Sequence, residues 1–104
     1  MDSDADPAHM DITPAVRALS AMGEQALPAL LAPLDSEDTM TRLHAQRAVE
    51  GVYYARHGFR AGQGFPSPAD ESRVRDELMA IGYAYDAAPE QRRAAIARLR
   101  DRLP

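Results

Sequence analysis

The sequence of 104 residues contains no cysteine and no tryptophan, and it contains no lysine and no asparagine either. Without cysteine the chain can form no disulfide, can bind no metal through thiolates and has no cysteine nucleophile. All twelve basic residues are arginine, a bias that we attribute to a GC-rich genome and from which we infer no function. Aromatic residues make up only 6% of the chain.

Long hydrophobic runs are also absent, and none approaches the roughly 18 apolar residues of a membrane span. The first ten residues, "MDSDADPAHM", have neither the basic start nor the apolar stretch of a signal peptide, so we expect a cytoplasmic protein. We interpret residues 1–10 as a flexible acidic leader or the remnant of a tag. With 45% hydrophobic and 27% charged residues, residues 11–104 have the composition of a single globular domain.

Helix signals follow one another along the chain. Thr13 before Pro14 predicts a helix start, and a left-handed cap at Gly23 would end that helix. The next stretch, "MGEQALPALLAPLD", places its leucines on one helical face, while Pro28 and Pro33 fall near the two ends of a short helix. A long helix is predicted from the acidic residues 35–38 to Gly58, and the interior Gly51 indicates a close packing neighbour.

The second half of the chain begins with "FRAGQGFPSP", whose glycines and prolines predict an irregular loop. A new helix is predicted from Ser67 and Pro68 to Gly82, then a short link, "YAYDAA", and a last helix that begins at Pro89. No segment shows the alternation of apolar and polar residues that is typical of a β-strand. We therefore predict an all-α fold of about five helices.

Residues 12–52 resemble the HEAT repeat family. The segment "AVRALSAMGEQALPALLAPLD" is similar to the helix pair of one repeat, and "RLHAQRAVEGV" is similar to the first helix of the next. The resemblance implies stacked antiparallel helix pairs in a scaffold or adaptor, and it ends at Tyr53. Because one repeat cannot bury its apolar face alone, we expect a C-terminal helical cap, a longer repeat array or a homodimer to cover it, and we favour the cap.

Catalytic and metal-binding patterns are weak. His9, His44 and His57 are too far apart in sequence for a local metal motif, and the acidic clusters fall at predicted helix starts, where the helix dipole explains them. We expect no metal, no cofactor and no catalytic residues, and a binding protein in preference to an enzyme. An enzyme or ligand-binding domain with a pocket near His57 is the alternative.

The last helix carries five arginines and raises a further alternative, a nucleic-acid binder. They are Arg92, Arg93, Arg98, Arg100 and Arg102. Their positions surround the helix instead of forming one stripe, and the net charge of the chain is −4. We therefore expect nucleic acid not to be the partner, and we expect these side chains to be solvated.

A cluster of aromatic and basic residues around the glycine loop is the main candidate for a binding site. Tyrosine and arginine are enriched in the residues that dominate interface energetics, and irregular loops on helical scaffolds often bind partners. We expect Phe59 and Phe65 to point inward. The predicted partner-binding residues are Tyr53, Tyr54, Arg56, His57, Arg60 and, on the later link, Tyr85. The predicted function is a small HEAT-like module that binds another protein through a helix face and the loop at residues 53–65.

Overall fold

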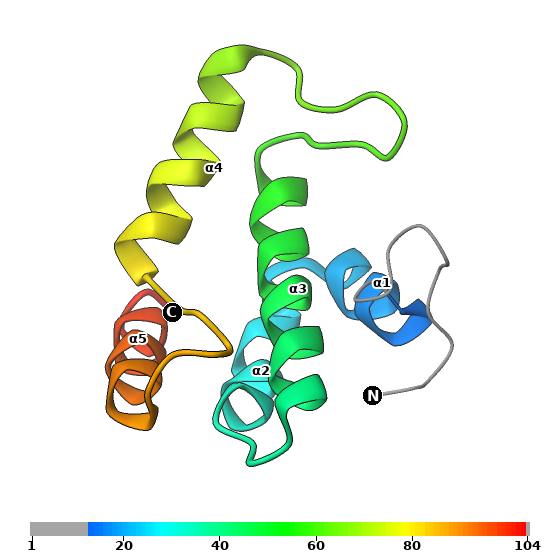
Figure 1. The fold of residues 1–104 in the computed structure, drawn as a ribbon. Helices are drawn as coiled ribbons and strands as arrows, with labels where there is room; N and C mark the ends of the chain where they lie inside the picture. Colours follow the sequence, from blue (N-terminus) through cyan, green and yellow to red (C-terminus); the bar gives the residue numbers. More distant parts are fainter. Residues whose placement is uncertain (1–12, 104) are drawn as a thin grey trace.

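The computed structural model describes residues 13–103, and this part of the chain is helical apart from its turns, its loops and one isolated β-bridge between Arg60 and Gly64 (Figure 1). The prediction of an all-α fold with five α-helices is confirmed. The elements are α1 (Pro14–Ala21), the 3-10 turn η1 (Gly23–Ala26), α2 (Leu27–Leu34), α3 (Thr39–Arg56), α4 (Pro68–Ile81) and α5 (Pro89–Asp101). The predicted leader at residues 1–10 and His9 lie outside the described residues.

The long helix α3 occupies the centre of the fold, with α1 and α2 packed against it (Figure 1). The antiparallel pairing of the first two helices, which the HEAT resemblance implies, is wrong in this structure, because α1 and α2 pack on α3 and not on each other. The turn η1, which opens at Gly23 with φ 72°, separates the two helices. The apolar face of α2 is nevertheless covered, since Leu30 and Leu34 are buried.

Local capping determines where the helices begin and end. The Thr13 side chain accepts a hydrogen bond from the Val16 amide, and Ser67 likewise caps α4 ahead of Pro68. The helix α4 ends at Gly82, as the sequence predicts, and Gly82 has the left-handed conformation, at φ 69°. The start predicted for α3 is too early, because residues 35–38 precede the helix and Asp38 is its cap.

Gly51 lies where α1 crosses α3. A Cβ atom at this position would overlap the Ser20 Oγ and lie 2.8 Å from the Ser20 Cβ, so a larger residue requires Ser20 to move. The Ser20 hydroxyl is fixed there because it donates a hydrogen bond to the Val16 carbonyl of its own helix. The predicted packing neighbour of Gly51 is therefore confirmed.

The C-terminal helix α5 packs on both α2 and α4. Its Ile96 and Leu99 join a continuous hydrophobic core with residues of every other helix. Two hydrogen bonds connect the later elements with their neighbours. The Tyr83 hydroxyl, just after α4, donates to the Leu34 carbonyl at the end of α2. Arg98 Nε, on α5, donates to the Ile81 carbonyl at the end of α4. The later helices thus supply cover for the first half of the chain.

Arg42 joins the start of α3 to the residues just before it and to the distant link between α4 and α5. Its side chain is buried, and its guanidinium donates to the carbonyls of Tyr85 and Ser36 at 2.9 and 2.8 Å. The neighbouring Gln46 side chain accepts a hydrogen bond from the Tyr85 amide at 2.9 Å. The two α3 side chains therefore hold the backbone of the α4–α5 link against the centre of the fold.

Candidate functional site

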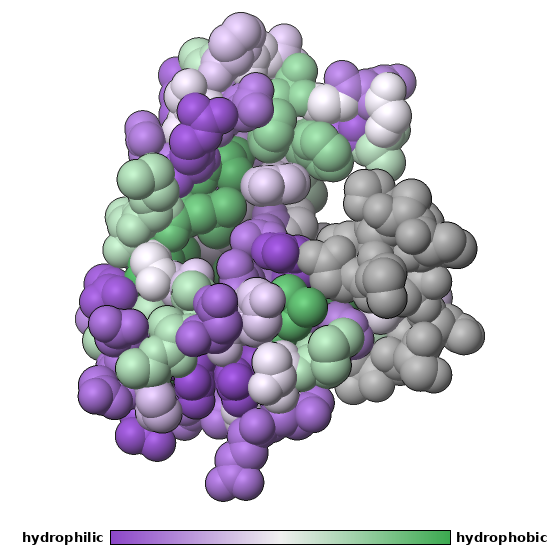
Figure 2. Space-filling view, in the orientation of Figure 1, coloured by the Kyte–Doolittle hydropathy of each residue, from purple (hydrophilic) through white to green (hydrophobic). Residues whose placement is uncertain are grey.

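A groove of about 510 Å³ lies between α3 and α4. In Figure 2, hydrophobic side chains gather in the hollow between these two helices. The groove is lined by Tyr54, Phe65, Glu71, Val74, Arg75, Leu78, Met79, Gly82 and Tyr83. Most of these residues are apolar or aromatic, and the two charged ones both belong to α4. The groove therefore combines an apolar lining with a charged border along one helix.

Three aromatic rings form a cluster at the loop end of the groove. The ring of Tyr54 lies 5.4 Å from that of Phe59 and 5.5 Å from that of Phe65, and the two phenylalanine rings are 5.1 Å apart. These spacings and tilts are favourable for aromatic pairs. Because α3 ends at Arg56 and α4 begins at Pro68, the rings lie where the loop joins the two helices.

Tyr83 lies at the other end of the groove, just after α4. Its hydroxyl is occupied by the Leu34 carbonyl, so the ring is fixed against the core. Burial raises the pKa of Tyr83 and that of Tyr54 above the ordinary value of 10.0 for tyrosine. Both groove tyrosines are consequently neutral at physiological pH and present aromatic surface with no added charge.

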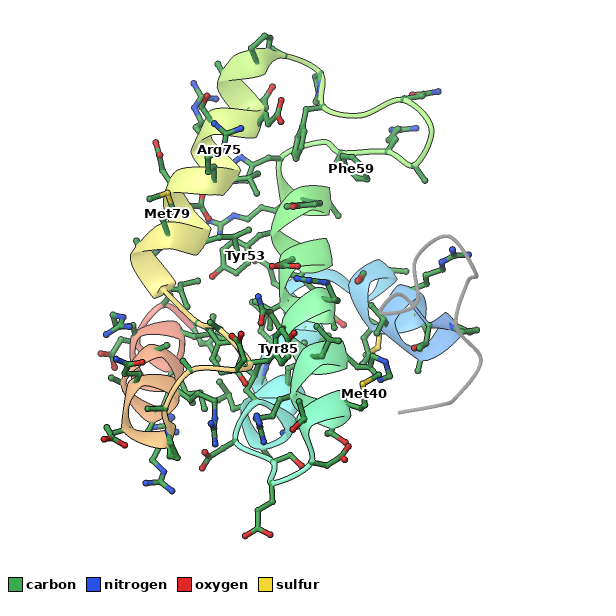
Figure 3. All side chains as sticks on the ribbon, in the orientation of Figure 1. Met40, Tyr53, Phe59, Arg75, Met79 and Tyr85 are labelled. Atoms are coloured by element: carbon green, nitrogen blue, oxygen red, sulfur yellow. The ribbon has the colours of Figure 1, made fainter. Side chains whose placement is uncertain are left out.

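One side of the groove is formed by successive turns of α4. Glu71 and Arg75 form an ion pair at 3.6 Å there, and each side chain is more than half exposed. One turn further along, Met79 is 73% exposed, although it is a large apolar residue (Figure 3). Leu78 and Val74 lie deeper and pack with the core. These three residues, Glu71, Arg75 and Met79, form an exposed stripe along α4 that is acidic, then basic and then apolar.

Outside the groove, a second polar cluster joins the end of α3 to α4. His57 Nε2 lies 2.7 Å from Glu77 Oε1, and Arg56 Nη1 lies 3.1 Å from Glu24 Oε1 and 3.9 Å from Glu77 Oε2. The histidine and the carboxylate are suitable groups for proton transfer. Neither the groove nor the smaller cavity in the core is lined by His57. The cluster has a clear structural role, since it fastens α4 to α3.

The predicted partner-binding residues do not form one surface in the structure, because they lie in different surroundings. Tyr53 is only 2% exposed and belongs to the core, so its prediction as a contact residue is wrong: residues adjacent on a helix face different directions, and Tyr53 faces inward. Tyr54 instead lines the groove. Arg56 and His57 belong to the polar cluster with Glu77.

The other predictions around the loop have mixed outcomes. Arg60 is exposed, and its backbone pairs with Gly64 across a tight turn. Tyr85 is half-buried and far from the aromatic cluster, beside the lower part of α3 (Figure 3). Phe65 packs against the core as expected. Phe59 is 36% exposed, so the expectation that both phenylalanines point inward is wrong for this residue, whose neighbours cover only part of its ring.

Several arginines of α5 have partners within the fold. Arg92 Nη1 donates to the Ala87 carbonyl at 2.7 Å, and Arg98 donates to the Ile81 carbonyl at 2.8 Å. Arg93 lies 3.8 Å from Asp35. These three side chains therefore connect α5 with neighbouring segments, and they do not project together as one basic surface.

Residues 13–103 contain no group of three or more histidines and carboxylates placed to hold a metal ion. Within the same residues, no helix has the length and apolar character to cross a membrane. Comparisons with protein-family models, with curated proteins and with solved structures give no match to this chain. A function must therefore be inferred from the groove itself.

Most of the groove is not predicted by the sequence. Tyr54 is singled out from the sequence, but Val74, Arg75, Leu78 and Met79 are assigned no role in binding. One available signal is Met79, which lies beside the apolar stripe of its helix and not within it. The separation of α3 from α4, which creates the groove, has no local sequence signal.

Proposed function

We propose that this protein is a protein-binding module and that its binding surface is the groove between α3 and α4. A helix or short segment of a partner would place apolar side chains against the groove, as amphipathic helices do in other hydrophobic grooves. The observation that carries the proposal is the apolar lining of a groove of about 510 Å³ with a highly exposed methionine on its border.

The composition of the groove supports protein as the ligand. Aromatic residues, methionine and arginine are enriched at protein interfaces, and Tyr54, Met79 and Arg75 represent all three kinds here. Methionine is flexible and polarisable, so Met79 can adapt to the shape of a partner. The aromatic rings lose little conformational entropy on binding because they are already fixed by their neighbours.

The absence of cysteine allows a direct test. A single cysteine introduced by Met79→Cys is the only thiol in the chain, and it can carry a photoactivatable benzophenone. Ala29→Cys provides a matched control, because Ala29 is exposed on α2 and does not line the groove. Illumination in an extract of the source cells, followed by electrophoresis and mass spectrometry, identifies whatever occupies each position.

We expect a discrete crosslinked polypeptide from position 79 and none from position 29. An excess of unlabelled protein should suppress this product, whereas an excess of the unlabelled Met79→Asp variant should not, because a charge at this position opposes apolar contact. Absence of any product, or the same products from both positions, would overturn the proposal.

A further inference from the structure

The exposed stripe of α4 has a pattern that can pair with itself. Glu71 and Arg75 are one helical turn apart on the groove side, and Met79 follows one turn later. When two copies of such a helix run antiparallel, a residue near the start of one lies opposite a residue near the end of the other. If the stripe contains one acid and one base, the acid of each copy can then face the base of the other copy.

The residue numbers define one such alignment. If Glu71 of one copy faces Arg75 of the other, the two-fold axis passes beside residue 73, and both Glu–Arg pairs form at once. The same alignment places Met79 opposite position 67 of the other copy. Position 67 is the cap of α4 and follows Phe65, a member of the aromatic cluster at the loop end of the groove, by two residues.

We propose that the groove between α3 and α4 binds a second copy of this chain, with the two α4 helices antiparallel and Glu71 of each facing Arg75 of the other. This inference rests on the proposed function and names its partner. It accounts for the 73% exposure of Met79, because each methionine would lie against the aromatic cluster of the other copy. Contacts between sulfur and aromatic rings are favourable.

The charges in the groove fit this partner. Both charged lining residues belong to the stripe, and the groove thus carries one acid and one base. A strongly acidic or strongly basic partner would leave one of them facing a like charge, which is unfavourable at an interface. A second copy leaves neither without an opposite charge.

Charge reversal tests the alignment directly. We expect Glu71→Arg and Arg75→Glu each to weaken self-association by about tenfold or more, because each variant places like charges opposite each other twice. The two variants mixed together should associate, since the stripe of the first variant carries two bases and that of the second carries two acids. Analytical ultracentrifugation over a concentration series measures all three cases.

Asp76→Arg is the matched control, because Asp76 is exposed on α4 and does not line the groove. This variant should associate like the unmodified chain, and circular dichroism should show the same helicity for every variant. A monomeric unmodified chain at all concentrations, or equal association of the mixture and of the separate variants, would overturn the inference. A crosslink from position 79 to a different protein, together with a monomeric chain, would overturn the inference and leave the proposed function standing.

Discussion

At the scale of single residues, close approach between helices depends on the smallest side chains. Gly51 contributes no side chain where α1 crosses α3, and Ser20 fills the space that a Cβ would need. A glycine inside a helix costs about 1 kcal/mol relative to alanine, so helix propensity alone favours replacement. The contact with Ser20 opposes it.

We expect Gly51→Ala to lower the free energy of unfolding by about 1–3 kcal/mol, the usual cost of overpacking a core. Urea denaturation measures the change. The double variant Ser20→Gly/Gly51→Ala should be less destabilised than the sum of its single variants, because the contact is removed. A stabilised Gly51→Ala protein would show that propensity outweighs packing here.

The sequence predicted this residue correctly for a physical reason. An interior glycine is unfavourable unless something requires it, so its presence indicates a neighbour. Helical periodicity also separates Tyr53 from Tyr54, because Tyr53 follows the buried Val49 by four residues and the buried Ala45 by eight, on the apolar face of α3. That Tyr54 lines a groove depends on where α4 lies, and that is a tertiary property.

At the scale of the elements, α3 begins at a charged cap. Asp38 Oδ2 accepts hydrogen bonds from the Thr41 amide at 2.9 Å and from the Thr41 hydroxyl at 2.6 Å. These hydrogen bonds, that of the hydroxyl first, hold the pKa of Asp38 below the ordinary value of 3.8. The charged form is therefore favoured in the folded chain, and its stabilising contribution is complete above pH 3.8 and disappears as the pH falls through the lowered pKa.

We expect the difference in stability between the unmodified chain and Asp38→Asn to depend on pH. Asparagine is also a good helix cap but does not titrate, so the unmodified chain should lose stability relative to the variant on acidification to about pH 2.5. Thermal melts of both proteins at neutral and acidic pH measure this difference. An unchanged difference would contradict the role of the charged cap.

Helix boundaries followed from such local chemistry, whereas helix pairing did not. The helix starts at Thr13 and Ser67 and the helix end at Gly82 were all predicted, because each depends on residues within one helical turn. The pairing of α1 with α2 was predicted from resemblance to HEAT repeats and is wrong, because η1 and the close contact with α3 decide the orientation of α1. Membership of that family stays a prediction.

At the scale of the whole molecule, Arg42 holds the two halves of the chain together. Its guanidinium satisfies carbonyls of Ser36, before α3, and Tyr85, after α4. The planar guanidinium can donate in both directions at once, which an ammonium group cannot reproduce with the same geometry. This residue was not singled out from the sequence, because its partner Tyr85 is distant along the chain.

We expect Arg42→Ala to lower the free energy of unfolding by about 3 kcal/mol, because two carbonyls lose their hydrogen bonds in a partly buried region. Arg42→Lys should recover only part of this loss. Denaturation curves for the three proteins measure both effects, and a loss below about 0.5 kcal/mol, typical of surface positions, would contradict the role of Arg42.

Local sequence patterns are sufficient to predict the all-α class, the identity of the helices and most of their ends. These properties depend on apolar periodicity, caps, prolines and glycines, which act over one or two helical turns. Packing of the whole chain is needed to establish that α1 and α2 both pack on α3 and that Tyr54 lines a groove beside α4. The reason is that these properties depend on contacts between residues far apart in the chain, and local pattern does not specify them.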